Sequence, residues 1–146
     1  MTQQTKVFRD LLKSNRYFAT KPRLRLFALL QKYNELTINE LIAHLHRHDQ
    51  ATVYRNIKVF ESLGIINRLR LGWNSKLELS DIFQHHHHHL SCMRCNKIII
   101  LPENPAIEHA IVHLSQQQQF QPLDHQLEIR GICYGCAAIK DKCATT

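Results

Sequence analysis

The hydrophobic positions in the first 45 residues follow a helical pattern. An amphipathic helix is predicted over residues 6–14, where apolar side chains recur at helical spacing: Val7, Phe8, Leu11 and Leu12. A second helix is predicted from about Thr20, because Pro22 falls in its first turn, where a missing N–H has no cost. Thr37 and Glu40 have the spacing of a capping box and predict the start of a third helix.

A fourth helix is predicted over residues 49–63. Asp49 can cap its N-terminus, and Gly64 can end it in the left-handed conformation. Three apolar residues define its buried side: Val53, Ile57 and Phe60. The other side carries residue types that bind phosphate or read bases in a major groove: Thr52, Tyr54, Arg55, Asn56 and Lys58. Exposed charged side chains are usually only solvated, so this helix does not by itself establish DNA binding.

Two strands are predicted after this helix, over residues 65–71 and 76–79, joined by a turn at residues 72–75. Helices followed by a basic two-stranded hairpin favour a winged helix-turn-helix. Residues 1–80 carry 14 Lys and Arg against six Asp and Glu, a net charge of +8. Because affinity for polyanions comes from summed charge, this surplus makes double-stranded DNA the expected partner.

The rest of the chain has a different composition. Residues 81–146 carry five Lys and Arg against six Asp and Glu, a net charge of −1, together with all five cysteines and eight of the 11 histidines. The polyanion-binding and metal-binding signals therefore occupy different segments. We expect a DNA-binding domain over residues 1–80, a hinge over residues 81–85 and a second domain over residues 86–146.

Two C-x2-C knuckles stand in the second domain: Cys92 with Cys95, and Cys133 with Cys136. Two such turns brought together supply four thiolates to a tetrahedral Zn²⁺, the closed geometry of a structural site. A redox dithiol would explain one pair and leave the other unaccounted for. The fifth cysteine, Cys143, lies in a polar tail and is expected to have no role.

The run His85–His89 resembles a purification tag, but it lies in the middle of the chain, directly before the first knuckle. If the run is a strand, successive side chains alternate between its two sides. His86 and His88 then share one side, while His87 and His89 share the other. One strand can therefore supply two metal sites, although imidazole suits many divalent metals and does not name the ion.

Between the knuckles we predict a strand over residues 97–101, a helix over residues 105–115 opened by a proline, and a strand over residues 126–130. The fold class is α+β, a winged helix-turn-helix followed by a small α/β domain with a four-cysteine zinc site. Such a small module buries little surface on its own, and a second copy would cover its open sheet edges. A homodimer is therefore expected, since dimeric readers bind palindromic half-sites.

Nearly the whole chain resembles the ferric uptake regulator (Fur) family of bacterial metal-dependent repressors. The resemblance rests on four motifs: Ala51-Thr52-Val53-Tyr54-Arg55, Thr20-Lys21-Pro22-Arg23, His86-His87-His88-His89-Leu90 running into the first knuckle, and the second knuckle. It implies a homodimeric repressor that binds operator DNA when a regulatory metal is loaded. Iron is the metal expected first, and zinc, manganese or peroxide sensing are alternatives within the family. The lack of an added cysteine near the sensory ligands disfavours a zinc sensor.

The resemblance also implies three metal sites. Cys92, Cys95, Cys133 and Cys136 match the structural zinc site. Glu78, His87 and His89 match a sensory site at the hinge. His86, His88, Glu108 and His125 match an additional site in the dimerisation domain, where His88 replaces the aspartate of many members.

The chain departs from the family pattern at several positions. The hinge site usually gains a histidine near the third helix, where this chain has Glu35 as a possible substitute. A basic residue commonly precedes the second helix to reach a minor groove; Phe18-Ala19 stands there, and Arg16 is a candidate to replace it, alongside Arg23. Three histidines have no family counterpart and are read as surface groups: His44, His46 and His48.

Two other functional classes share parts of this sequence pattern. A zinc hydrolase could use three histidines and an open coordination position, but no general base stands beside the His run, and an enzyme has no need of the fourth helix. A metal-buffering protein would bind metal without DNA. We therefore expect a regulator that is not an enzyme. We expect it to be cytoplasmic and not membrane-bound, since no run approaches the roughly 20 apolar residues of a spanning helix and the N-terminus lacks the apolar core of a signal peptide.

Overall fold

The computed structural model describes residues 2–45, 49–71 and 74–139. They form two compact units, Met1–His85 and His86–Thr146. The first unit contains four helices and three strands, α1(Gln3–Ser14), α2(Lys21–Tyr33), β1(Glu35–Thr37), α3(Ile38–His44), α4(Gln50–Ser62), β2(Ile66–Leu71) and β3(Asn74–Leu79). The second contains β4(His87–Cys92), β5(Ile98–Pro102), α5(Pro105–Gln117), β6(Glu128–Gly131) and α6(Tyr134–Ala138). No helix in the described ranges has the length and apolar character needed to cross a membrane.

The helix starts and stops of the first unit follow the local signals in the sequence. The Thr37 hydroxyl accepts the Glu40 N–H at 3.2 Å, and the Glu40 carboxylate accepts the Thr37 N–H at 2.7 Å, so the predicted capping box is confirmed. Asp49 caps α4 as predicted, and Gly64 after the helix has φ +63°. α1 begins at Gln3, earlier than predicted. The prediction missed this first turn because its residues are polar and show no hydrophobic periodicity.

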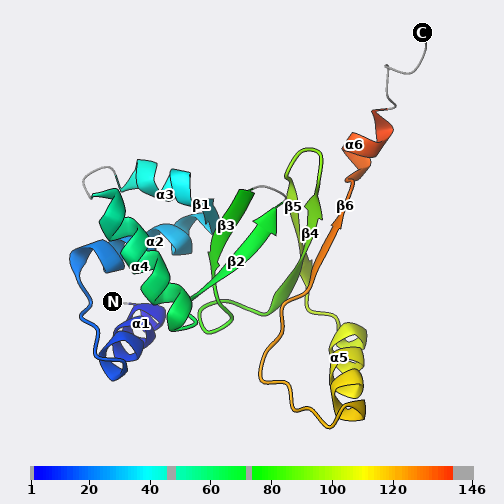
Figure 1. Cartoon of the computed structure of the whole chain (residues 1–146), viewed down its shortest axis with the longest axis horizontal. Coiled ribbons are helices and arrows are strands. Elements are labelled where there is room, and N and C mark those ends of the chain that lie inside the picture. Colours follow the sequence, from blue (N-terminus) through cyan, green and yellow to red (C-terminus); the bar gives the residue numbers. More distant parts are fainter. Residues whose placement is uncertain (1, 46–48, 72–73, 140–146) are drawn as a thin grey trace. The chain divides into compact units, whose positions relative to one another are not determined.

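The helices of the first unit enclose an aromatic core. Phe8 of α1 stacks on Phe27 of α2 with ring centroids 4.2 Å apart, and Phe60 of α4 meets Phe8 edge-on at 5.3 Å. Phe83, which follows the sheet, meets Phe27 edge-on at 4.9 Å. All four rings are at most 3% exposed. Figure 1 shows α1 to α4 gathered on one side of the small sheet. A helix as short as α4 is only marginally stable by itself, so packing against these neighbours stabilises it.

The sheet of the first unit has three strands in the order β1-β3-β2, all antiparallel. The predicted hairpin is confirmed as β2 and β3, whereas the residues of its turn at 72–73 lie outside the described ranges. A third strand was not predicted: β1 pairs with β3 in the register Glu35↔Glu78. A three-residue strand has too few positions to show an alternating pattern.

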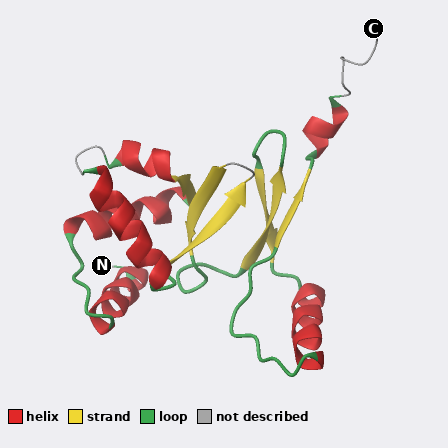
Figure 2. Cartoon of the chain, viewed as in Figure 1, coloured by secondary structure: helices red, strands yellow, loops and turns green. Residues whose placement is uncertain are grey.

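The sheet of the second unit has the order β5-β4-β6, with β4 antiparallel to β5 and parallel to β6. Figure 2 shows α5 and α6 at opposite ends of this sheet. The predicted strands and helix are present with shifted ends, and α5 is capped by Asn104, whose side chain accepts the Ala106 N–H at 2.9 Å. The short helix α6, which begins between the second pair of cysteines, was not predicted.

The two units differ sharply in how much apolar surface they bury. Every buried apolar side chain that the structure describes in the first unit belongs to one continuous cluster, apart from Leu69. Among the described residues of the second unit, Cys92 is the one buried apolar side chain, and the other buried residues there are polar: His88, His89 and Ser91. The second unit as a single copy therefore lacks a hydrophobic core.

Candidate metal centres and nucleic-acid interface

The four knuckle cysteines converge at one end of the second sheet. Cys92 ends β4, and Cys133 is the N-cap of α6. All four are free thiols whose sulfur atoms lie within 4.8 Å of one another. Cys95 Sγ and Cys133 Sγ are 3.8 Å apart, which is about the edge of a tetrahedron with the roughly 2.3 Å arms of Zn–S bonds. The arrangement fits a four-coordinate zinc ion.

The protein environment treats the sulfurs unequally. Backbone N–H groups of Cys133 and Cys95 donate hydrogen bonds to the Cys92 sulfur, and the Cys133 nitrogen lies 3.3 Å from it. These bonds lower the pKa of the Cys92 thiol to about 6. Hydrogen bonds with the side chains of Cys133 and Cys95 favour the protonated form of Cys136 and raise its pKa to about 12. The metal-free site is thus prepared to bind a cation at Cys92 and must lose protons elsewhere as the ion enters.

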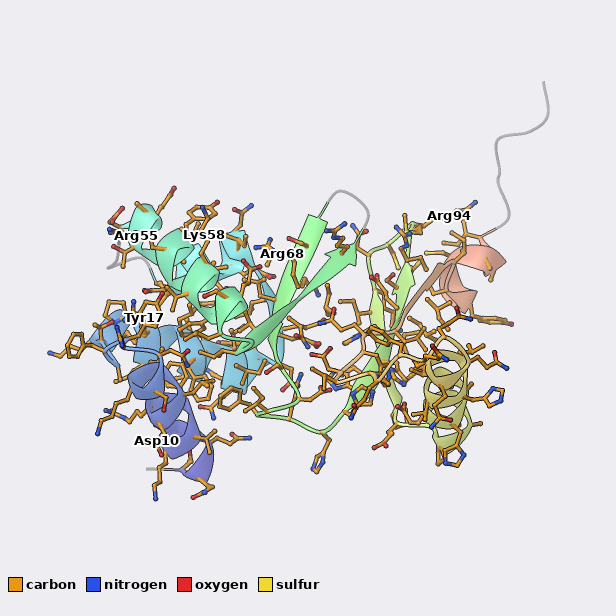
Figure 3. The ribbon with its side chains drawn as sticks, turned by 60° about the horizontal axis from the view of Figure 1, so that its bottom comes forward. Asp10, Tyr17, Arg55, Lys58, Arg68 and Arg94 are labelled. Carbon is orange, nitrogen blue, oxygen red and sulfur yellow. The ribbon has the colours of Figure 1, made fainter. Side chains whose placement is uncertain are left out.

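A contact that the sequence analysis missed joins the two knuckles. Arg94 stands between the cysteines of the first knuckle, and its Nη1 donates to the Cys136 carbonyl oxygen at 3.1 Å. Figure 3 labels Arg94 beside the short helix that carries Cys136. No sequence signal could have found this contact, because the acceptor is a backbone carbonyl that every residue has.

A second cluster draws its members from separate segments of the same unit: His86 directly before β4, His88 in β4, Glu108 on α5, and His125 in the loop before β6. His88 Nε2 lies 2.9 Å from Glu108 Oε1, and His125 Nε2 lies 3.3 Å from Glu108 Oε2. His86 Nε2 is 3.1 Å from His125 Nε2 and 3.7 Å from Glu108 Oε1. An ion with about 2 Å bonds would have tetrahedral edges of about 3.3 Å. Three imidazole nitrogens and a carboxylate therefore converge at the right separation for a divalent metal.

His88 is the most enclosed member of this His–Glu cluster. Its side chain is fully buried, and its Nδ1 is one of two buried side-chain polar atoms without a hydrogen-bond partner in the described residues. A buried polar atom without a partner costs free energy, so the enclosed His88 ring is held at that cost with its Nε2 engaged by Glu108 Oε1 at 2.9 Å. A cation bound in this cluster would take the place of the Nε2–Glu108 hydrogen bond.

The opposite side of β4 carries the other pair of histidines. The rings of His87 and His89 have centroids 4.7 Å apart, and His89 is buried. Glu78 belongs to β3 of the first unit, where it is 5% exposed and pairs with Glu35 across the sheet. Glu35 itself accepts a hydrogen bond from Lys76 Nζ at 2.9 Å. The predicted alternation of the His run between the two sides of a strand therefore matches the grouping seen within the second unit.

The exposed side of α4 presents four of the five residues expected there. Arg55 and Lys58 are exposed, Tyr54 is 45% exposed, and Thr52 is half-buried. Arg55 Nη2 donates to the Thr52 hydroxyl at 3.2 Å, and the Thr52 hydroxyl donates to Asp49 at 2.8 Å. This chain of bonds orders the first turn of the helix, and Figure 3 shows Arg55 and Lys58 extending from α4.

Asn56 is a correction to the sequence analysis. It was expected on the exposed side of α4, but it is 7% exposed and lies on the buried side of the helix. Val53, Asn56, Ile57 and Phe60 follow the i, i+3, i+4, i+7 spacing of one helix face, so the periodicity itself carried the signal. Its side chain is therefore not available for reading a base from this face.

The two remaining basic candidates are Arg16, in the loop between α1 and α2, and Arg23, in the first turn of α2. Arg16 is exposed and adopts φ +63°. Arg23 is half-buried; its Nη1 donates to the Phe18 carbonyl at 2.7 Å, and its guanidinium lies 5.1 Å from the centre of the Tyr17 ring. Arg23 therefore holds this loop in place in addition to carrying charge.

The remaining candidates have little bearing on a site. His44 stacks on Tyr33 with ring centroids 4.9 Å apart, as a surface histidine would. His46, His48 and Cys143 lie outside the described residues.

The comparisons with known proteins agree with this layout. The sequence profile of the "Ferric uptake regulator family" matches residues 14–130. The chain belongs to this family. Its members are metal-responsive transcriptional regulators. A curated member, the peroxide-responsive repressor PerR of Staphylococcus aureus strain USA300, is 34% identical over 88 residues, which are 59% of this chain and 56% of that protein. The chain thus matches about half the length of that curated relative.

Solved structures of family members match more of the chain. The ferric uptake regulator of Vibrio cholerae is 32% identical, with a TM-score of 0.68 over 84% of this chain and 96% of that one. The ferric uptake regulator of Francisella tularensis, solved with iron, is 30% identical, with a TM-score of 0.68 over 83% of this chain and 95% of that one. The fold expected from the sequence, an N-terminal helical DNA-binding domain and a C-terminal α/β domain, is therefore confirmed.

Proposed function

We propose that this chain is a metal-responsive transcriptional repressor that binds a palindromic operator in double-stranded DNA as a homodimer. The observation that carries the proposal is the convergence of three imidazoles and one carboxylate on one point of a chain whose other unit presents an exposed basic helix. Members of its family are regulators rather than enzymes, and we infer the same here, with the cytoplasm as the place of action.

The DNA contact is assigned to α4 and to two basic residues at the entry to α2, one in the preceding loop and one in the first turn of the helix. The residues assigned to it are Thr52, Tyr54, Arg55, Lys58, Arg16 and Arg23. The net charge of +8 over residues 1–80 supplies the electrostatic attraction to phosphates. The exposed face of α4 is free of acidic side chains between Asp49 and Glu61, so its base-reading turns can approach a polyanion.

Homodimer formation is supported by the apolar surface of the second unit. Ile100, Leu114 and Phe120 are 54%, 61% and 66% exposed, and Leu123 is 94% exposed. An apolar pocket near the zinc site is lined by Leu90, Ile99, Ile129 and Ile132 among others. Burying these side chains against a second copy would give the unit the hydrophobic core that a single copy lacks.

Two kinds of metal site are proposed. Cys92, Cys95, Cys133 and Cys136 hold a structural Zn²⁺, which ties the two knuckles together. The regulatory divalent metal, with Fe²⁺ preferred and Zn²⁺ or Mn²⁺ as alternatives, occupies two further sites. One is the cluster of His86, His88, Glu108 and His125, and the other is a hinge site of Glu78, His87 and His89.

Regulation then follows from linkage between metal and DNA. Glu78 belongs to the DNA-binding unit, while His87 and His89 belong to the dimerising unit. A metal held by ligands of both units would bind more tightly to one arrangement of these units than to others. In that arrangement the two α4 helices of the homodimer have the spacing of successive major grooves. Thermodynamic reciprocity then requires operator DNA to tighten metal binding by the same factor.

The test is DNA binding measured against free metal. Duplexes are selected by the protein from a randomised 30-base-pair library, and their binding is followed by fluorescence anisotropy with Fe²⁺ or Mn²⁺ and with a chelator that spares the cysteine-bound zinc. Binding should require the regulatory metal, and Arg55→Ala should abolish it while elemental analysis finds unchanged zinc. Binding that ignores the regulatory metal would contradict the proposal.

A further inference from the structure

An aromatic ring projects into solvent from the α1–α2 loop, which comprises residues 15–20. Phe18 is 83% exposed, more than any other large hydrophobic residue that the structure describes in the first unit. The next most exposed, Ile82, is 53% exposed. Isolated exposed apolar side chains are ordinary on protein surfaces, so exposure alone assigns nothing to Phe18.

The loop backbone holds Phe18 in this position by several bonds. The Tyr17 N–H donates to the Leu12 carbonyl at 2.8 Å, and the Phe18 carbonyl accepts both the Thr20 N–H at 2.9 Å and Arg23 Nη1 at 2.7 Å. Arg16 adopts φ +63°, a conformation that a non-glycine residue reaches only where neighbouring contacts fix it. The ring is therefore presented by an ordered loop, and little conformational freedom would be lost when it binds a partner.

The charges around the ring indicate what that partner is. Residues 13–25 contain five basic side chains, Lys13, Arg16, Lys21, Arg23 and Arg25, and no acidic one. A protein partner that buried the Phe18 ring would also have to face these five positive charges, and that would cost free energy. A nucleic acid combines a negatively charged backbone with apolar sugar and base edges, and it suits a ring surrounded by cations.

The position of the loop relative to α4 indicates which part of the DNA it meets. Figure 3 shows Tyr17, the neighbour of Phe18, at the same end of the first unit as Arg55. A helix lying in a major groove brings flanking loops at that end against the phosphate backbone, beyond which the adjacent minor groove opens. Apolar side chains that enter a minor groove act as wedges between base steps.

We propose that Phe18 enters the minor groove next to the major groove occupied by α4, and that it contributes affinity without neutralising a phosphate. The cations of residues 13–25 hold the backbone on either side of the ring. This inference rests on the proposed DNA binding and adds a contact outside the recognition helix.

The experiment compares Phe18→Ala with the wild-type protein, loaded with metal, on duplexes selected by the wild type from a randomised 30-base-pair library. Affinity is measured across a range of salt concentrations, and hydroxyl-radical cleavage maps the sugars exposed in the minor groove. We expect Phe18→Ala to weaken binding at least about tenfold, the scale of losing aromatic contacts in both protomers. The slope of log affinity against log salt should not change, and protection should disappear at a minor-groove position beside the α4 footprint. Phe18→Trp should restore both.

Two control variants separate this inference from the proposed function. Ile139→Ala removes another strongly exposed apolar side chain, 70% exposed in the other unit and assigned to neither the DNA contact nor the homodimer contact, and should leave DNA affinity unchanged. Lys58→Ala should reduce the salt slope, since it removes an exposed cation of α4 without removing Arg55. If Phe18→Ala binds within twofold of wild type, or if it lowers the salt slope as a cation does, the wedge is wrong while DNA binding stands. If the wild-type protein selects no duplex, the proposed function itself fails.

Discussion

Removing zinc should unfold the second unit and leave the first unit folded. The structure gives the reason, since the first unit has a continuous apolar core, whereas Cys92 is the one buried apolar side chain among the described residues of the second. Two perturbations apply: a chelator strong enough to strip the cysteine site, and Cys95→Ser, which removes one of its four sulfurs.

The size of the effect can be worked out for each unit. The first unit, Met1–His85, should keep an unfolding enthalpy of roughly 60 kcal/mol, at about 0.7 kcal/mol per residue. Zinc present at about a thousand times its dissociation constant stabilises the form that binds it by about 4 kcal/mol. Whole small domains are stable by only about 5–15 kcal/mol, so loss of this contribution removes much of what keeps the second unit folded.

Scanning calorimetry of the full chain, with zinc content measured on the same sample, provides the assay. The zinc-loaded protein should show a second transition, from unfolding of the second unit. Its midpoint temperature should rise with zinc concentration, and also with protein concentration, because a second copy completes that unit. Both dependences should vanish in Cys95→Ser, while the transition of the first unit stays. Cys143→Ser, which removes the fifth cysteine of the sequence, should behave like wild type. A second transition that survives at the same temperature after zinc is lost would refute the reasoning.

Four further predictions concern single features. Thr37→Ala removes the capping-box hydroxyl of α3 and should lower the free energy of unfolding by about 1 kcal/mol, measured by urea titration; no change would mean that the box contributes nothing. Hydrogen bonds from Thr37 hold the pKa of Glu40 below its ordinary value of 4.5, so its contribution is present above that pH and fades as pH falls further; the difference between wild type and Thr37→Ala should shrink accordingly in acid. Gly64→Ala should cost about 1 kcal/mol, because φ is +63° although a Cβ there would meet no atom within 4 Å; Gly64→Asn should cost less. His88→Ala should remove metal from the His–Glu cluster and leave cysteine-bound zinc intact in elemental analysis; an unchanged metal content would show that His88 is not a ligand.

Much of the fold could be predicted because its signals are local. Thr37, Asp49 and Gly64 act within one helical turn, and their side-chain or backbone chemistry is visible in the sequence. The convergence of the two knuckles, 37 residues apart, was also predictable, since tetrahedral zinc requires four ligands and each turn supplies only two.

The features that escaped prediction depend on partners distant in the chain. β1 exists because Leu36 pairs with Leu77, a contact that no three-residue pattern announces. Arg94 contacts a carbonyl whose position depends on how α6 begins. Asn56 was misassigned for another reason: its residue type suggested base reading, while its helical spacing put it in the core. In that case position along the helix was a better guide than chemistry.

The arrangement of β4 also limits how this protein can evolve. Its histidines serve opposite faces only because pairing with β5 and β6 fixes which residue faces which way, for example His88↔Leu101 and His89↔Glu128. A slip of one residue in that pairing would exchange the two sets of donors. An insertion or deletion in the strand would therefore reassign both sets of histidines at once, whereas point substitutions such as aspartate at position 88 adjust one set and leave the other untouched.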